Sequence, residues 1–343
     1  MKIRKRNGQT AEYERSKIER VIYLACSSAG ISDAQEHALR LAEEVEKKLF
    51  RHGGDGIAVE RIQDQVEESL MTAGLYEAAK RFILYRNEHS RARHAREQVL
   101  AHLQNRRAAE AELKQLQQEF AAEEYDLHLL TARFQSHYRG EQDDEKALAA
   151  LTRAAAELTT RDAPAWEMIA ARFWLLSFRS RLARYEAEAG ITCLHDKITH
   201  LTKQGVYGSY ILAHYSKAEI DTFEQILRPE RDKLLNYSGL ELLHGRYLIR
   251  THAGRVLESP QEMFLGIALH LAMNEQQNRS EWVKRFYDML STLKVTMATP
   301  TLANARKPFH QLSSCFIDTL FASRKEDPRI FFAKSDHFLA LTY

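Results

Sequence analysis

The chain has 343 residues, of which 44% are hydrophobic and 28% are charged, and its formal net charge is +2 at pH 7. These values are typical of a globular protein with two or three domains, and so small a charge gives no reason to expect nucleic acid or a membrane as a partner. The sequence contains neither a bilayer-length apolar run nor an apolar signal core at its start. We therefore expect a cytoplasmic protein.

The three cysteines, Cys26, Cys193 and Cys315, are far apart in the sequence and form no CxxC pair. A disulfide framework or a structural zinc site is not expected from this spacing, and we predict no metal in this chain. Free cysteines are usually small buried residues, so we interpret each of the three first in that way. A reactive thiol is the alternative.

The first 90 residues predict a small domain with one hairpin and several helices. Asn7-Gly8 is a strong signal for a two-residue hairpin turn, which places strands at residues 3–6 and 9–13. Ser16 is the expected cap of a helix that ends at Gly30, and a second helix begins at Ser32 or Asp33 and stops at Gly53-Gly54. A third strand is expected at 57–59, followed by helices over 60–73 and 75–90.

Residues 91–143 are rich in Ala, Glu, Gln, Arg and Lys, a composition that favours a helical connector with solvated charges. The start of this region is basic, and a nucleic-acid-binding patch is the alternative interpretation. Few aromatic residues are interleaved there, and Glu88 and Glu97 dilute the charge. The arginines concerned are Arg86, Arg91, Arg93, Arg96, Arg106 and Arg107.

A second helical region begins near Glu145. Asp162-Ala-Pro164 is typical of a helix start, Ser259-Pro-Gln-Glu262 is a capping box, and Ser280 is expected to begin a further helix. Between them, residues 247–250 and 255–257 predict a hairpin. Thr299-Pro300 interrupts the helical pattern, and residues 311–317 predict a strand.

The strings Lys5-Arg6-Asn7-Gly8 and Glu12 to Ile18 resemble the ATP cone, a small regulatory domain that binds ATP or dATP, and residues 76–86 resemble its closing helix. Lysine ammonium groups and the free N–H groups at a helix start suit phosphate oxygens. Val59 stands where relatives often have a polar residue. A domain retained for packing alone is the alternative. The resemblance assigns nucleotide binding to Lys5, Arg6, Ala11, Glu12, Tyr13, Glu14, Arg15, Ser16 and Lys17.

Three further strings, at residues 284–288, 297–304 and 311–316, resemble the large subunit of class I ribonucleotide reductases, and the match runs from about residue 144 to 320. The resemblance implies a mainly α fold with the first strand of a ten-stranded α/β barrel. The domains expected are the cone (1–92), a helical connector (93–143), the reductase helical domain (144–295), the start of the barrel (296–320) and a divergent tail (321–343).

The chemistry implied by this resemblance is the reduction of ribonucleoside diphosphates to deoxyribonucleotides by a cysteine thiyl radical. Cys315 matches the first member of the family's redox pair, and Thr299 and Ser314 match substrate-binding positions. Read without the family, Thr299 is a residue constrained by Pro300, and Ser314 is an ordinary strand serine. The implied partners are a small subunit that generates the radical and holds the metal, thioredoxin or glutaredoxin, and a second copy in a homodimer.

After Asp318 the resemblance stops, which suggests a frameshift or a truncated gene. The family's radical cysteine and second redox cysteine lie beyond this point, and one strand cannot close a barrel. We therefore expect no reductase activity from the chain alone. The alternative function is a non-catalytic module that senses ATP or dATP or binds another subunit.

Overall fold

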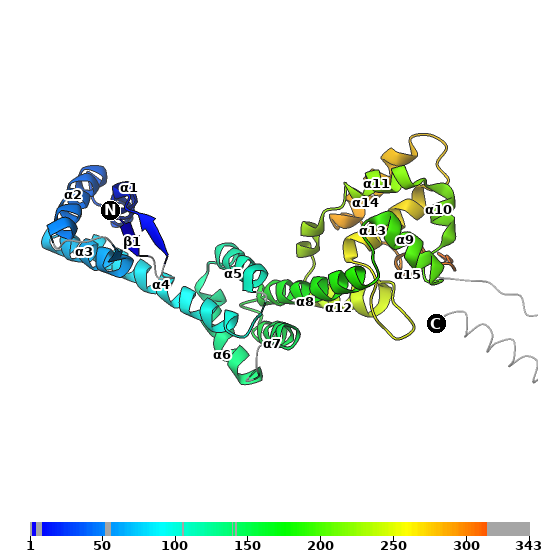
Figure 1. The fold of residues 1–343 in the computed structure, drawn as a ribbon, viewed down its shortest axis with the longest axis horizontal. Helices are drawn as coiled ribbons and strands as arrows, with labels where there is room; N and C mark the ends of the chain where they lie inside the picture. Colours follow the sequence, from blue (N-terminus) through cyan, green and yellow to red (C-terminus); the bar gives the residue numbers. More distant parts are fainter. Residues whose placement is uncertain are drawn as a thin grey trace, which may run out of the picture. The chain divides into compact units, whose positions relative to one another are not determined.

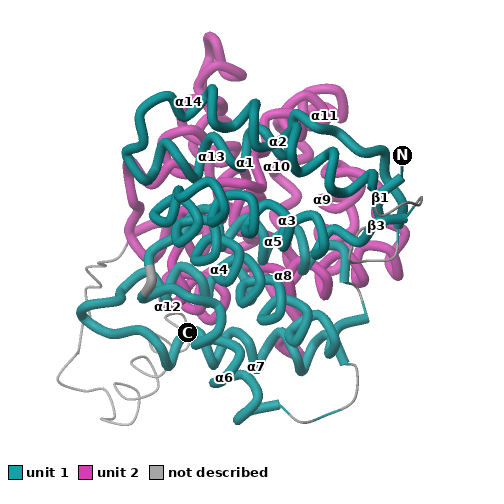
Figure 2. Tube along the Cα trace, turned by 90° about the vertical axis from the view of Figure 1, so that its left-hand side faces the viewer, with its two compact units in different colours: residues 1–173 teal, residues 174–343 magenta. Residues whose placement is uncertain are grey.

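A computed structural model describes residues 2–4, 9–51, 56–104, 106–138, 140 and 143–313 (Figure 1). The chain divides into two compact units, residues 1–173 and 174–343, which are coloured separately in Figure 2. We describe each unit by itself. Where the structure is described, most residues are helical and one small sheet lies near the N-terminus, as the sequence predicts.

The sheet has three strands in the order β2-β1-β3. Strand β1 (Lys2–Arg4) pairs antiparallel with β2 (Thr10–Glu12), so that Ile3 lies opposite Ala11. Strand β3 (Ile57–Ala58) pairs with β1 in the parallel direction and brings Ile57 beside Ile3. The predicted strand pairing and the third strand are confirmed, whereas the turn at Asn7-Gly8 lies outside the described residues.

Four helices complete this part of the first unit: α1 (Arg15–Ser28), α2 (Ala34–Arg51), α3 (Val59–Thr72) and α4 (Tyr76–Leu100). Helix α1 packs on α2 and α4, and α3 packs on α2 and α4. Apolar side chains at helical spacing form their common core, because burying them removes their surface from water. They include Ile18, Ile22, Leu41, Val45, Val66, Leu70 and Phe82.

The predicted cap of α1 is wrong by two residues. The cap residue is Glu14, and Ser16 lies inside the first turn, with no side-chain capping bond at this end among the described residues. Arg15 begins the helix and its Nε lies 3.0 Å from Glu19 Oε1, an i,i+4 ion pair that stabilises the earlier start. Gly30 ends α1 with a φ of +70°, as predicted, and the expected stop of α2 at Gly53-Gly54 lies outside the described residues.

Helix α4 extends ten residues beyond its predicted end, into the region expected to be a connector. That region continues with α5 (Arg106–Glu119), the 3₁₀ turn η1 (Glu123–Tyr125) and α6 (Leu127–His137), and α7 (Asp144–Glu157) begins where the second helical region was predicted to start. The region expected to be a connector is helical as predicted, but it is not simply solvated, because Leu113, Leu116 and Phe134 are buried.

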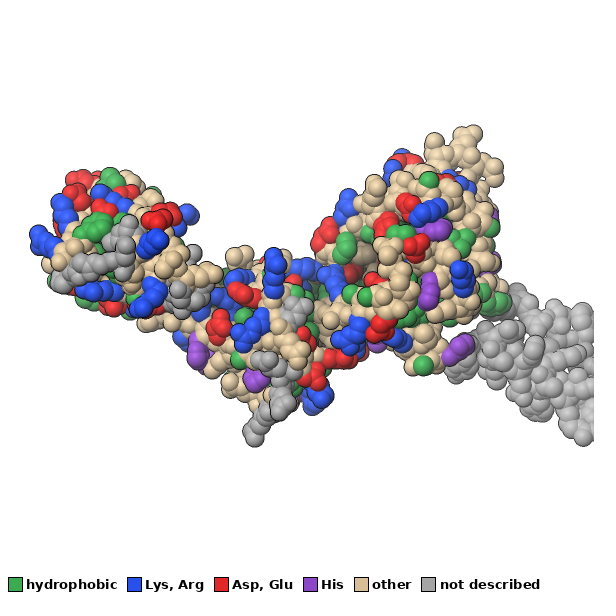
Figure 3. Space-filling model, in the orientation of Figure 1, with side chains coloured by type: hydrophobic (Ala, Val, Ile, Leu, Met, Phe, Trp, Pro, Cys, Tyr) green, Lys and Arg blue, Asp and Glu red, His purple; other side chains and the backbone are tan. Residues whose placement is uncertain are grey.

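The basic start of the region predicted to be a connector contacts other parts of the first unit. Arg91 lies 3.7 Å from Asp126, and Arg96 binds the side chain of Gln117. Figure 3 shows Lys and Arg interspersed with Asp and Glu over the visible surface of the described residues, without a segregated basic face. These observations favour a packed helical segment over a nucleic-acid-binding patch.

Helix α8 (Trp166–Glu188) follows the predicted start signal, and Gly190 ends it with a φ of +68°. In the first unit its Arg172 is buried and binds two glutamates of α5, Glu112 at 2.8 Å and Glu119. A buried guanidinium needs such partners, because an unpaired charge would lose its hydration.

The second unit is built around α13 (Pro260–Ala272), which is buried along almost its whole length. The capping box of Ser259 and Glu262 is confirmed. Around α13 lie eight further described elements. They are α9 (Leu194–Lys203), α10 (Ser209–His214), α11 (Lys217–Glu224), the 3₁₀ helix η2 (Pro229–Leu234), α12 (Tyr237–Leu242), the π-helix η3 (Leu243–Tyr247), α14 (Arg279–Ser291) and α15 (Thr299–Asn304). Of these, α14, η2 and α15 pack directly on α13.

Three expectations for this unit need correction. The hairpin is reduced to one bridge between Arg250 and Val256, because Tyr247 belongs to η3. Helix α14 begins at Arg279 rather than at Ser280, after Asn278 in a left-handed conformation. The Thr299-Pro300 string opens the short helix α15, where proline is tolerated in the first turn.

The predicted strand at 311–317 falls mostly outside the described residues. Its described part, residues 311–313, has no regular secondary structure. Among the helices formed by the described residues, none combines the length and the apolar character needed to cross a bilayer.

Candidate functional site

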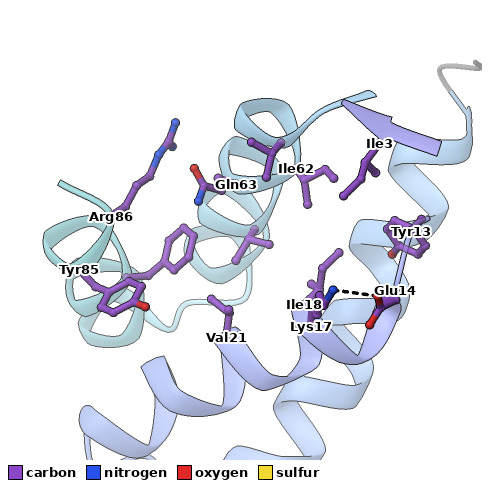
Figure 4. A pocket seen from close by; sticks show the side chains of 13 residues that line it. Ile3, Tyr13, Glu14, Lys17, Ile18, Val21, Ile62, Gln63, Tyr85 and Arg86 are labelled. Carbon is purple, nitrogen blue, oxygen red and sulfur yellow. Dashed lines mark hydrogen bonds and ion pairs between the residues drawn. The ribbon is translucent and has the colours of Figure 1, made fainter. Parts of the chain in front are cut away.

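The first unit contains a pocket of about 190 Å³ between β1, the start of α1, and helices α3 and α4 (Figure 4). Its lining comes from segments that are far apart in the sequence, and the sheet and the helix core hold them together. The residues that line it are Ile3, Tyr13, Glu14, Lys17, Ile18, Val21, Val59, Ile62, Gln63, Val66, Phe82, Tyr85 and Arg86.

Of the residues assigned to nucleotide binding from the sequence, the pocket brings together Tyr13, Glu14 and Lys17. Ala11, Glu12 and Ser16 lie outside its lining, and Lys5 and Arg6 lie outside the described residues. Arg15 is also outside the lining. Its guanidinium binds carboxylates of α1 and α2, with Glu46 at 3.5 Å and Glu43 at 4.0 Å, in addition to Glu19.

The pocket is largely apolar. Hydrocarbon surface comes from Ile18 and Val21 on α1, Ile62 on α3 and Phe82 on α4. Val59, which the sequence marked as a departure from relatives, is also part of this apolar lining. A surface of this kind binds a flat, weakly polar group by excluding water from both faces.

The described lining contains two cations, and both are paired with carboxylates. Lys17 Nζ lies 2.8 Å from Glu14 Oε1, and both side chains are more than half exposed. Arg86 Nη1 lies 2.6 Å from Asp64 Oδ1 and 3.4 Å from Glu67 Oε2. In Figure 4, Lys17 comes from the start of α1 and Arg86 from α4, on different sides of the pocket.

Tyr13 connects the pocket to the core beneath it. Burial, and after it the nearby carboxylate of Glu46, raise the pKa of the Tyr13 hydroxyl to about 12. The Tyr13 ring meets the ring of Phe50 edge-on, with centroids 5.9 Å apart. The hydroxyl therefore stays protonated at physiological pH and acts as a neutral hydrogen-bonding group.

The second unit contains Thr299, the first residue of α15. Its Oγ1 lies 3.2 Å from the hydroxyl of Tyr247, and the backbone oxygen of Tyr247 accepts a hydrogen bond of 2.8 Å from Arg306 Nη2. Thr299 is exposed, so its hydroxyl can be reached from solvent even though it is hydrogen-bonded to Tyr247. Ser314 and Cys315, the other two residues predicted for substrate binding and catalysis, lie outside the described residues.

The other two cysteines differ from each other. Cys26 is buried in the core of the first unit, as predicted, whereas Cys193 is partly exposed at the start of α9. Within the described residues, Cys193 forms a group with Asp221 and Glu224 whose ligand atoms lie within 4.8 Å of one another. The ammonium group of Lys217 lies 3.9 Å from the Cys193 sulfur, and its positive charge disfavours the binding of a metal ion to this group.

Comparisons with known proteins match two parts of the chain to family models. Residues 1–91 match the ATP cone domain, and residues 233–310 match the all-alpha domain of ribonucleotide reductase. The chain is 46% identical over 325 residues to the ribonucleoside-diphosphate reductase subunit alpha of Treponema pallidum (strain Nichols), which covers 93% of this chain and 38% of that protein. The chain belongs to the ribonucleoside-diphosphate reductase alpha-subunit family.

Two other members of this family show the same relationship at lower identity. The ribonucleoside-diphosphate reductase subunit alpha of Chlamydia pneumoniae is 29% identical, over 93% of this chain and 33% of its own length. The ribonucleoside-diphosphate reductase 1 subunit alpha of Escherichia coli (strain K12) is 31% identical, over 49% of this chain and 22% of its own length. The chain thus spans 22% to 38% of the length of these relatives.

The family assignment places the pocket within the ATP cone match and Thr299 within the all-alpha domain match. Apart from Val59, the contribution of α3 to the pocket was not predicted from the sequence. Val59, Ile62, Gln63 and Val66 recur at helical spacing on one face of α3, and this period was the available signal. Tyr85 and Arg86 were noted as part of a closing helix but not as site residues.

Proposed function

We propose that the pocket in residues 1–92 binds ATP or dATP as an allosteric effector of ribonucleoside-diphosphate reductase. The observation that carries this proposal is the combination of an apolar pocket with cations on two sides, Lys17 and Arg86, inside a segment that matches the ATP cone. The apolar surface suits a purine base, and the two cations suit phosphate oxygens.

Several other groups support phosphate binding at this site. The first turn of α1 leaves backbone N–H groups available, and the positive end of a helix of 14 residues favours an anion. Lys5 and Arg6 follow β1 directly, so we assign them to the same phosphate group. Val59 supplies no hydrogen bond, and we therefore expect packing rather than polar contact at that position.

The test of nucleotide binding is calorimetric titration of the 343-residue chain with ATP and dATP. We expect Lys17→Met to weaken binding roughly tenfold or more, because it removes a charge-assisted hydrogen bond. Lys47→Met is the matched control, since Lys47 is similarly exposed and also pairs with a glutamate, Glu43, on α2. Absence of binding, or equal losses in both variants, would contradict the proposal.

We further propose that the chain acts within an enzyme that reduces ribonucleoside diphosphates to deoxyribonucleotides. Thr299 and Ser314 bind the substrate, and Cys315 is one of the two cysteines that deliver electrons and become a disulfide. The thiol–disulfide step then requires thioredoxin or glutaredoxin to restore both thiols. The radical comes from a small partner subunit, the large subunit forms a homodimer, and the domain boundaries are those predicted from the sequence.

The test of this role is reduction of cytidine diphosphate by the complete reductase that contains this segment. We expect Cys315→Ser to abolish turnover and Thr299→Ala to raise the substrate KM. Cys26→Ser is the control, because Cys26 is buried in the cone and has no part in the proposed chemistry. Full turnover by the Cys315→Ser variant would contradict the assigned role.

A further inference from the structure

We propose that Arg86 is a competitively held phosphate ligand, whose release from Asp64 and Glu67 sets the nucleotide affinity of the pocket. This inference rests on the proposed nucleotide binding and adds its regulation. The guanidinium is bound by two carboxylates of α3, so an incoming phosphate must displace them.

The geometry places Arg86 between two possible sets of anions. It projects from α4 and lines the pocket next to Tyr85 and Gln63 (Figure 4). Its Nη1 atom lies 2.6 Å from Asp64 Oδ1 and 3.4 Å from Glu67 Oε2. Asp64 and Glu67 are one turn apart on α3, so both carboxylates face α4 from the same side of that helix.

The exposure of the three side chains makes this exchange feasible. Arg86 is 23% exposed and Glu67 is 30% exposed, whereas Asp64 is 64% exposed and remains hydrated after losing its partner. An ion pair with so exposed a carboxylate contributes little to stability. A phosphate group can accept two parallel hydrogen bonds from one guanidinium, and such charge-assisted bonds are short and strong. It therefore competes effectively with the two carboxylates for Arg86.

The two carboxylates oppose nucleotide binding by holding the guanidinium away from the ligand. Removing their charges while keeping their shapes should therefore release Arg86 and strengthen binding. Lys17 is restrained less, because Lys17 and Glu14, its partner among the described residues, are both more than half exposed.

The experiment compares the wild-type chain with Asp64→Asn/Glu67→Gln, with Arg86→Met, and with the triple variant. Calorimetry measures the affinity of each for ATP and for inorganic tripolyphosphate, and thermal unfolding checks that each is folded. We expect the double variant to bind roughly three- to tenfold more tightly than the wild type. In the Arg86→Met background the same two substitutions should change the affinity less than about twofold, because their effect passes through Arg86.

Glu68→Gln is the matched control for loss of a negative charge on α3. Glu68 is adjacent to Glu67 but binds Lys48 on α2, so we expect its loss to alter the affinity less than about twofold. Asp64→Asn alone is the second variant, because Asp64 is the most exposed of the three groups and its loss is the least disruptive to the fold.

The outcomes separate this inference from the proposed function. ATP binding by the wild type with no gain in the double variant, or an equal gain with and without Arg86, would overturn the inference alone. Absence of binding by every variant would overturn the proposed function and this inference with it. A gain that depends on Arg86 would support both.

Discussion

The guanidinium of Arg306 is fully buried against the carboxylate of Glu258, with its Nε 3.0 and 2.9 Å from the two oxygens. The same guanidinium donates to the carbonyl oxygens of Leu302 at 2.7 Å and Tyr247 at 2.8 Å. Glu258 in turn accepts a hydrogen bond of 2.7 Å from the backbone of Ile249. This pair therefore joins α15, which carries Thr299, to the segment that follows η3.

We expect Arg306→Met to lower the free energy of unfolding of the second unit by about 3–5 kcal/mol, because it leaves the Glu258 carboxylate buried without its partner. Urea denaturation followed by circular dichroism measures this change. Arg285→Met is the control, since Arg285 and its partner Glu281 are both more than half exposed. A loss below about 1 kcal/mol is expected for the control, and equal losses in both variants would refute the assignment.

The pH dependence of stability should report on His270. Burial, and after it the neighbouring His310, lower the pKa of His270 to about 4. The Tyr210 hydroxyl donates its one proton to the Ala305 carbonyl at 2.5 Å, so Nδ1 of neutral His270 donates to the Tyr210 oxygen at 2.9 Å. The fold therefore favours the neutral imidazole.

Because an unfolded histidine binds its proton near pH 6.5, the contribution of His270 is complete above that pH. It is lost as the pH falls from about 6.5 towards 4, by at most about 3 kcal/mol. Urea unfolding at pH 7.5 and 5 should show this loss in the wild type and in the exposed control His252→Asn. His270→Asn should reduce it, and an unchanged loss in that variant would count against the prediction.

The core of the ATP cone offers a pair of leucines on one helix that differ in burial. Leu41 on α2 is fully buried, whereas Leu39 is 44% exposed. We expect Leu41→Ala to cost about 3 kcal/mol, because it removes apolar contacts and leaves a cavity, and Leu39→Ala to cost less than about 1 kcal/mol. Chemical denaturation of both variants tests this, and similar costs would mean that α2 is packed differently.

The thiols of the two described cysteines should differ in reactivity. Burial raises the pKa of the Cys26 thiol, whereas Cys193 is partly exposed at the start of α9. We expect iodoacetamide at pH 8 to modify Cys193 at least about tenfold faster than Cys26, because alkylation needs an accessible thiolate. Mass spectrometry of digested samples measures both rates. Rapid modification of Cys26 in the folded protein would contradict the structure.

Local signals in the sequence were sufficient for much of the fold. The pairing of β1 with β2 follows from Asn7-Gly8, and the capping box at Ser259 and Glu262 needs residues only three apart. Such features depend on residues that are close together in the sequence, so they can be predicted from one sequence alone. The helix start at Arg15 was missed because part of its support comes from Glu43 and Glu46 on another helix.

Contacts between distant segments were beyond prediction. Nothing near Arg172 in the sequence indicates that Glu112 and Glu119 will enclose it, and this packing distinguishes a folded segment from a solvated connector. In the candidate site, Lys17 was predicted from the family motif, but the pairing of Arg86 with Asp64 depends on how α3 lies against α4. A pattern can identify a helix face, but the neighbour of that face is decided by the whole fold.

The length of α4 has a mechanical consequence. In its first half this helix carries Phe82, Tyr85 and Arg86 at the pocket, and its last turns bury Ala95 and Val99 where it packs with α5 and α6. The stretch from Arg86 to the end of the helix at Leu100 is about 21 Å long. A tilt of the helix by about 5° at the pocket would therefore displace its far end by about 2 Å, which is more than the range of donor–acceptor distances in hydrogen bonds.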